Sequence, residues 1–279
     1  MYRKVILQII KDEHDYLDHW IQYHSKLGFD FILVEDYFSE SHEEICNKYD
    51  NVTLIKLFDF LSAHRINRVK QGEFRQYTIL EEFIDKNCTG IYDYDVCLFI
   101  DPDEYMLDLN LKMLNTYCNN LLNENYNSAY LFNWKWMTSN DRNVIFNENP
   151  DLSIPVYERF KDEANIDKNN CDLVTNAGKM LINLRFFNNV NDFIKMDSRI
   201  PHYISNLKFI DNVYVYHYCT NSIKEYIKRL INKGEMTNEW FIRKLYHFNI
   251  INYIFSNDYN KYIEDNNLKI LQTKVNVFN

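Results

Sequence analysis

The chain has 279 residues, of which 46% are hydrophobic and 16% aromatic, so it can bury the core of one large or two small domains. Its 40 acidic and 31 basic residues give a formal net charge of -9, which argues against nucleic acid as the main partner, because binding a phosphate backbone needs a basic surface. The six cysteines form no C-x-x-C pair, and no run approaches the roughly 18 consecutive apolar residues of a membrane span, so we predict a soluble, cytoplasmic protein, with peripheral membrane contact left open.

Apolar runs and segments with helical spacing alternate through the first half of the chain. The run Val5–Ile10 is too short for a secretory signal and is predicted to form the first strand, followed by a helical pattern that Gly28 ends. Further strands are predicted at 31–34, 52–57, 96–100 and 129–134, with helices at 41–49, 74–84 and 110–122. This order predicts an α/β fold with a mostly parallel sheet flanked by helices.

The second half of the chain has a different character. Residues 138–176 are rich in Asn, Asp and Glu and show little periodicity, which predicts long loops over the sheet. Later elements are predicted as strands at 179–187 and 212–218 and a helix at 222–234. Because the last residues have an aromatic, helical pattern, we predict one domain over 1–235 and a helical C-terminal tail over 236–279 that packs on it.

The most informative stretch is an apolar strand that ends in acids. Val96 to Ile100 are all apolar, which is typical of a strand buried on both faces, and Asp101-Pro102-Asp103-Glu104 follow directly. The carboxyl end of such a strand lies at the ligand crevice of an open α/β sheet. Two Asp residues there favour a hard divalent cation such as Mg²⁺ or Mn²⁺, completed by water and phosphate oxygens, and the alternative is a solvated acidic turn.

Several short motifs occur in a fixed order along the chain. They are Lys11-Asp12-Glu13 with Tyr16-Leu17, Trp20, Tyr23-His24 and Gly28; Asp36 and Ser39; Gln76; the run Phe99–Tyr105; Glu158-Arg159-Phe160; Lys179; and His217-Tyr218 with Ser222, Glu225 and Tyr226. Together these motifs resemble those of GT-A glycosyltransferases, in particular glycosyltransferase family 92 and bacterial family-2-like proteins. The resemblance implies a GT-A, Rossmann-like form of the predicted α/β fold.

The resemblance also implies a reaction. It is a metal-dependent, inverting transfer of a sugar from a nucleotide-diphosphate sugar, with a UDP-sugar as the expected donor, to a hydroxyl of a glycan or other acceptor. The implied ligands of Mn²⁺ or Mg²⁺ are Asp101, Asp103 and His217, with Asp101 either sharing the ion or holding the donor's ribose. A histidine on an apolar strand is also common in a core, so a structural role for His217 stays open.

The donor's nucleotide is expected over the ends of the first two strands. The resemblance places Lys11, Glu13, Asp36 and Gln76 there, together with Asp101, although Lys11 and Glu13 fit the start of a solvated helix equally well. Guanidinium groups bind phosphate oxygens in pairs, so some arginines are candidate diphosphate clamps. These arginines are Arg65, Arg68, Arg75 and Arg229.

An inverting reaction needs a carboxylate that takes the proton of the acceptor hydroxyl, and Asp141 and Glu158 are the candidates. Two other function classes stay open: a metal-dependent nucleotidyltransferase or phosphatase, and a non-catalytic sugar-nucleotide-binding protein of the same fold. The sequence has no glycine-rich phosphate loop and no second carboxylate cluster, which argues against the first class. The intact Asp101, Asp103 and His217 argue against the second.

Overall fold

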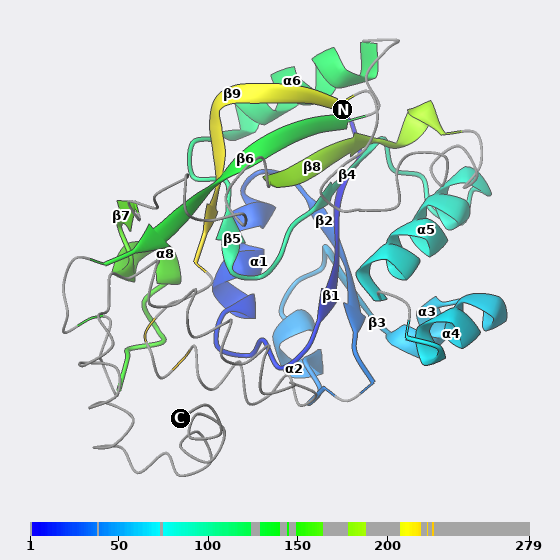
Figure 1. Ribbon diagram of the computed structural model, residues 1–279, viewed down its shortest axis with the longest axis horizontal. Helices are drawn as coiled ribbons and strands as arrows, with labels where there is room; N and C mark the ends of the chain where they lie inside the picture. The colour runs from blue at the N-terminus through cyan, green and yellow to red at the C-terminus, as the bar shows by residue number, and fades with distance from the viewer. Residues whose placement is uncertain are drawn as a thin grey trace, which may run out of the picture. The chain divides into compact units, whose positions relative to one another are not determined.

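A computed structural model of the protein describes residues 2–37, 39–72, 75–123, 129–139, 144, 149–163, 178–187, 207–218, 222 and 225 (Figure 1). The chain divides into two compact units. The first unit comprises residues 1–134 and 176–217, and the second comprises residues 135–175 and 218–279. The predicted domain boundary at residue 235 and the predicted tail over 236–279 lie outside the described residues.

A mixed β-sheet with nine strands in the described part of the chain forms the framework. Its strands are β1 (Lys4–Ile10), β2 (Asp30–Glu35), β3 (Val52–Lys56), β4 (Val96–Phe99), β5 (Glu104–Tyr105), β6 (Ala129–Thr138), β7 (Asp162–Glu163), β8 (Gly178–Asn183) and β9 (Leu207–His217). The order across the sheet is β3-β2-β1-β4-β8-β6-β9-β5, and β7 pairs with the end of β6. Figure 1 shows β1 (blue) between β2 and β4, with β8 and β6 beyond β4.

The predicted α/β class is confirmed, but the sheet is less parallel than predicted. Strands β1, β2, β3 and β4 pair in parallel. Strand β8 then inserts between β4 and β6 and pairs antiparallel with both, so β4 and β6 point the same way without touching. The chain between β4 and β6 contains a helix over Leu111–Asn123, as a connection between strands of the same direction requires. The insertion of β8 pairs residues that are distant in the sequence, so no local sequence signal predicts it.

Helices follow the first strands of the sheet. They are α1 (Leu17–Ser25), α2 (Glu43–Cys46), α3 (Leu57–Phe60), α4 (Ala63–Lys70), α5 (Arg75–Cys88) and α6 (Leu111–Asn123), and the short 3-10 helix η1 (Leu184–Phe186) follows β8. Helix α1 buries Leu17, Trp20, Ile21 and His24, the spacing of one helix face. Gly28 has a positive φ of 76° where the chain leaves α1, a conformation that glycine adopts without a Cβ clash.

The core of the first unit lies around its central strands. All four residues of β4 and all six of β8 are buried, as expected for strands covered on both faces. Helix α5 contributes Ile79, Leu80 and Phe83, which pack with apolar residues of these strands and of α3 and α4. None of the helices that the structure describes is both long and apolar enough to cross a membrane.

In the second unit the described elements are short. The last residues of β6 pair antiparallel with β7, with Met137 opposite Glu163. Helix α8 (Val156–Arg159) begins after Pro155, which suits a helix start because proline lacks the N–H that would be left without a partner there. Its buried residue is Val156.

Candidate functional site

The acid turn after β4, residues 101–104, is a tight and buried structure. The Glu104 N–H donates to the Asp101 carbonyl oxygen at 3.0 Å, and the Asp101 N–H donates to Glu104 Oε2 at 2.8 Å. Asp103 is 2% exposed and Glu104 is 0% exposed. The turn is therefore not a solvated acidic loop, and burying its carboxylates requires compensating partners.

Strand pairing brings a distant histidine to the acid turn. Strands β5 and β9 pair antiparallel with Glu104 opposite His217. His217 Nε2 lies 3.6 Å from Asp103 Oδ2 and 3.9 Å from Glu104 Oε1. The Trp134 ring lies against the imidazole, with ring centroids 4.8 Å apart. The structure thus brings together two of the three sequence-predicted metal ligands, Asp103 and His217.

The third predicted ligand, Asp101, has a different set of partners. Its Oδ2 accepts a hydrogen bond from Lys179 Nζ at 2.6 Å. Its Oδ1 accepts from Gln8 Nε2 at 2.6 Å and from Gln76 Nε2 at 3.3 Å. Lys179, on β8, is 2% exposed in its side chain and also lies 3.4 Å from Glu104 Oε2. Asp101 is therefore held from both sides by side chains of β1, α5 and β8.

The roles of Gln8 and Lys179 were missed from the sequence. Gln8 is a polar residue in the middle of the apolar run Val5–Ile10, and such a residue in a buried strand needs a hydrogen-bond partner. The sequence therefore contained a signal that Gln8 has a buried polar partner. Lys179 was noted only as a motif match, because nothing local to it shows that β8 pairs with β4.

Charges in the acid turn shift one another's protonation. Burial alone would raise the pKa of Asp101, but the charge and hydrogen bond of Lys179, together with His217, hold that pKa below its usual range. Burial, reinforced by Asp101 and Asp103, raises the pKa of Glu104 well above its usual range. Burial alone would lower the pKa of Lys179, but Asp101 and Glu104 raise it. The turn therefore favours the charged forms of Asp101 and Lys179, and its environment shifts Glu104 toward its neutral form.

The residues that face His217 fit a divalent ion completed by substrate. Within the described ranges, no three His, Cys, Asp or Glu side chains converge as a metal site. Mg²⁺ and similar ions are commonly held by one or two protein ligands plus phosphate oxygens and water, and ligands at right angles in their shells lie about 3 Å apart. The 3.6 Å separation of Asp103 Oδ2 and His217 Nε2 is close to that spacing. A carboxylate with an imidazole suits Mn²⁺.

Two of the predicted nucleotide-binding residues are linked through the start of α5. Asp36 follows β2, is 4% exposed and forms an ion pair with Arg75. The next residue, Gln76, reaches Asp101 at the end of β4. The Arg75 guanidinium also lies over the Tyr37 ring, 5.2 Å from its centroid. Asp36 Oδ1 is buried and accepts no hydrogen bond from the described residues.

The loop that carries Lys11 and Glu13 is tied to the loop after β2. Asp12 has a positive φ of 55°, and its N–H donates to Ser39 Oγ at 3.0 Å. The Glu13 N–H donates to His42 Nε2 at 3.1 Å. Lys11 is half-buried and has no ion-pair partner in the part of the chain that the structure describes. This loop is therefore ordered by its neighbours rather than a freely solvated helix start.

His42 holds the two loops together in its neutral form. Its Nδ1 lies 2.8 Å from Glu35 Oε1, and its backbone N–H donates to the same oxygen at 2.7 Å. Because Nε2 accepts from the Glu13 N–H, we assign the ring proton to Nδ1. Burial and the nearby His14 lower the pKa of His42 to about 4. The imidazole is therefore uncharged at neutral pH.

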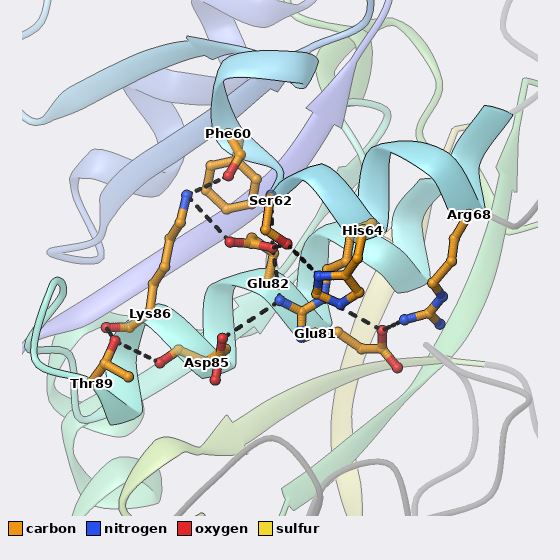
Figure 2. Close-up of polar contacts among 10 residues, drawn as sticks. Phe60, Ser62, His64, Arg68, Glu81, Glu82, Asp85, Lys86 and Thr89 are labelled. Carbon is orange, nitrogen blue, oxygen red and sulfur yellow. Dashed lines mark hydrogen bonds and ion pairs between the residues drawn. The ribbon is translucent and has the colours of Figure 1, made fainter.

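Two of the candidate diphosphate clamps serve another purpose. Figure 2 shows the network between α4 and α5. Arg65 Nη1 donates to Glu82 Oε2 at 2.7 Å, and Arg68 Nη1 donates to Glu81 Oε2 at 2.6 Å. Ser62 also donates to Glu82, from its N–H at 3.1 Å and its hydroxyl at 2.8 Å. Arg65 and Arg68 thus join two helices, and Arg229 lies outside the described residues.

Of the two candidate bases, the structure describes only Glu158. Asp141 lies outside the described residues. Glu158 is exposed on α8, in the second unit. Its neighbour Arg159 donates two hydrogen bonds to the buried Glu225, at 3.1 and 2.8 Å. The Glu225 N–H in turn donates to Ser222 Oγ at 3.3 Å. The motifs around 158–160 and 222–225 therefore stabilise one another inside the second unit.

Comparisons with known proteins give weak likenesses. No protein-family model matches the chain, and no curated protein matches it. Among solved structures, the galactosyltransferase LgtC with donor and acceptor sugar analogs is 12% identical over 85% of this chain and 98% of its own, with a TM-score of 0.39. Glucosyl-3-phosphoglycerate synthase from Mycobacterium tuberculosis with UDP is 12% identical over 66% of this chain and 57% of its own, with a TM-score of 0.35.

A third solved structure is an enzyme of another kind. It is 4-diphosphocytidyl-2C-methyl-D-erythritol synthase, which is 12% identical over 83% of this chain and 99% of its own, with a TM-score of 0.39. That score equals the score of the galactosyltransferase.

Proposed function

We propose that this protein is a glycosyltransferase that moves a sugar from a nucleotide-diphosphate sugar, with a UDP-sugar as donor, to a hydroxyl of a glycan or other acceptor. The observation that carries the proposal is the position of Asp103 and His217, which face each other across 3.6 Å at the carboxyl end of the buried strand β4. The ends of parallel strands are where open α/β sheets bind ligands.

Each residue of the site has a role in this proposal. Asp103 and His217 would hold Mn²⁺ or Mg²⁺, and such an ion would supply Lewis-acid stabilisation of charge on the leaving diphosphate. Asp101, fixed by its bonds to Gln8, Gln76 and Lys179, directs its carboxylate to the donor's ribose. A fixed carboxylate binds a hydroxyl without the entropy cost of ordering it first.

The nucleotide base and phosphates are assigned to the neighbouring loops. Asp36 keeps one buried oxygen without a hydrogen bond from the described residues, and a uracil ring N–H is a donor that would satisfy it. We assign Lys11 and Glu13 to the same nucleotide site, with Lys11 as the cation for a phosphate oxygen. In an inverting reaction, Asp141 or Glu158 takes the proton of the acceptor hydroxyl.

Binding and bond cleavage can be tested together. Isothermal titration with a panel of uridine and guanosine diphosphate sugars in the presence of Mn²⁺ should show binding by at least one of them. Asp103→Ala should remove that binding while its circular dichroism spectrum stays native. Asp93→Asn is the matched control, because Asp93 is an acid of the same unit whose side chain is 87% exposed.

Product analysis separates the reaction classes. Release of the nucleoside diphosphate, with the sugar on water or an acceptor, indicates cleavage at the anomeric carbon and supports glycosyl transfer. Pyrophosphate or inorganic phosphate among the products would assign the protein to the nucleotidyltransferases or phosphatases instead. Binding of no nucleotide sugar at all, with Mn²⁺ present, would refute the proposal.

A further inference from the structure

The loop after β1, residues 11–13, contains a strained backbone position. Asp12 has a positive φ of 55°, a conformation that residues other than glycine adopt only at a cost in free energy. Residues in such a conformation need neighbours that hold them, and they are concentrated at ligand-binding loops. The Asp12 N–H donates to Ser39 Oγ at 3.0 Å, and the Glu40 N–H donates to Asp12 Oδ1 at 3.1 Å. The loop after β2 therefore holds the strained residue from one side.

His42 holds the residue that follows the strained position. Its Nε2 accepts from the Glu13 N–H at 3.1 Å. This N–H belongs to the peptide that joins Asp12 to Glu13, so one imidazole nitrogen sets the orientation of that peptide. The Glu13 carbonyl oxygen accepts from the Leu17 N–H at 3.0 Å, where α1 begins. The loop is therefore fixed from its strained residue to the start of the helix.

The His42 ring is itself fixed on its other side. Glu35 Oε1 accepts from the Nδ1–H and the backbone N–H of His42, at 2.8 and 2.7 Å. Glu35 Oε2 forms an ion pair with Lys56, which lies opposite Glu35 in the pairing of β2 with β3. The His14 ring stacks on the imidazole, with ring centroids 4.0 Å apart. Because His42 is 0% exposed, its ring cannot turn without breaking these contacts.

The protonation state of His42 suits its role as an acceptor. A neutral imidazole donates from one ring nitrogen and accepts at the other, whereas an imidazolium only donates. Burial and the stacked His14 lower the pKa of His42 to about 4. At neutral pH its Nε2 therefore keeps the lone pair that accepts from the Glu13 N–H.

We propose that His42 is a positioning residue for the nucleotide-sugar donor, because it fixes the 11–13 loop in the conformation that directs Lys11 to the donor's diphosphate. Lys11 directly precedes the strained Asp12, so a rotation of the next peptide changes the direction of the Lys11 side chain. A displacement of about 1 Å in a group that positions a substrate has a large effect. This inference rests on the proposed function and adds a residue that acts on the donor only through this loop.

Two substitutions at His42 isolate the acceptor atom. In His42→Gln the side-chain oxygen can take the place of Nε2, whereas the shorter His42→Asn side chain keeps a donor for Glu35 and has no atom at the position of Nε2. UDP affinity is measured by isothermal titration with Mn²⁺ present. We expect His42→Asn to weaken UDP binding at least about tenfold, and His42→Gln to stay within about threefold of wild type.

The outcomes of this titration are distinct. Unchanged affinity in His42→Asn, or an equal loss in both variants, would overturn the inference and leave the proposed function intact. A wild-type protein that binds no nucleotide would refute the proposed function and the inference with it.

Combined variants test the route from His42 to the donor. Lys11→Met removes the group that we expect His42 to position. Adding His42→Asn to Lys11→Met should therefore weaken UDP binding by less than about twofold further. Additive losses would show that His42 acts on the donor by another route, and would overturn the inference.

A second buried histidine gives the matched control for stability. His24 is 0% exposed, and its Nδ1 lies 3.0 Å from the Trp20 carbonyl oxygen within α1. His24→Gln should lower the free energy of unfolding and keep the UDP affinity of wild type. If UDP affinity instead falls in step with stability in the His24 and His42 variants, the role of His42 is structural only and the inference is overturned.

The wild-type protein provides a test that needs no variant to fold. In nitrogen nuclear magnetic resonance at neutral pH, His42 should show a protonated Nδ1 and an unprotonated Nε2. A ring protonated at Nε2 could not accept from the Glu13 N–H, and that result would overturn the inference.

Discussion

Two clusters of buried and half-buried charged side chains lie in the first unit, and the balance between their acids and cations differs. In the α4–α5 network the charged groups are three cations and three acids, namely Arg65, Arg68, Lys86, Glu81, Glu82 and Asp85 (Figure 2). In the acid turn three carboxyl groups share one ammonium and one imidazole, namely Asp101, Asp103, Glu104, Lys179 and His217.

The difference in charge balance suggests that the α4–α5 network stabilises the fold and that the acid turn binds a cation. A balanced buried network satisfies its own charges and joins two helices, so an added ion has nothing to neutralise. An excess of carboxyl groups is unfavourable in the free protein, and an added cation relieves it. We propose that the excess of carboxyl groups over cations, rather than the number of charged residues, distinguishes the acid turn as the binding site.

The largest effect is expected at the unbalanced cluster. Asp103→Asn keeps the size of the side chain and removes the charge that we assign to the ion, so sugar transfer should fall about 100- to 1,000-fold. The midpoint of thermal unfolding without ligand should stay close to that of wild type. Steady-state kinetics with the best donor measures the loss. Full activity in this variant would show that transfer does not need the charge of Asp103, and the proposed functional difference between the two clusters would be wrong.

The next effect concerns the balanced cluster. Arg65→Met leaves Glu82 without its closest cation in a place where the Arg65 side chain is 4% exposed, so the free energy of unfolding should fall by about 3 kcal/mol. Urea denaturation measures the loss. Donor affinity in the folded variant should equal that of wild type. A variant that keeps its stability but loses nucleotide binding would reassign Arg65 to the diphosphate.

The pH dependence of the free energy of unfolding tests whether the α4–α5 network stabilises the fold. Burial alone would raise the pKa of Glu82, but hydrogen bonds from Arg65 and Ser62 outweigh it and hold that pKa below its ordinary value of 4.5. A carboxyl with a depressed pKa in the folded state adds stability above the unfolded-state value, and the gain is lost as the pH falls through the folded-state value.

The measurement compares wild type with Glu82→Gln. The free energy of unfolding of wild type should fall from about pH 5 downward, and the variant should show a smaller fall over the same range, starting from lower stability at neutral pH. Parallel curves for the two proteins would show that Arg65 and Ser62 do not hold the charge of Glu82.

The smallest effect is expected at an exposed pair. Arg3 and Asp93 lie 3.1 Å apart with side chains 52% and 87% exposed. Solvent screens such a pair, so Asp93→Asn should change the free energy of unfolding by about 0.5 kcal/mol or less. A loss as large as that of Arg65→Met would show that burial is not what distinguishes the three charged regions.

The site was only partly visible in the sequence. The apolar run before Asp101 predicted a buried strand with acids at its end, and the structure has both. The sequence could not show that Arg65 forms an ion pair with Glu82, because the two residues meet only when α4 packs on α5. Helices α3 and α4 were not predicted, since their short apolar patterns resemble a loop.

By itself the sequence determined the alternation of strands and helices and the acids after β4, because those depend on local periodicity. Only the tertiary structure decided that β8 inserts between β4 and β6, and that insertion carries Lys179 to Asp101. Likewise, β9 carries His217 to Asp103. Pairing between distant strands is set by the packing of the whole sheet, so no local pattern could show that Lys179 pairs with Asp101 or that His217 faces Asp103.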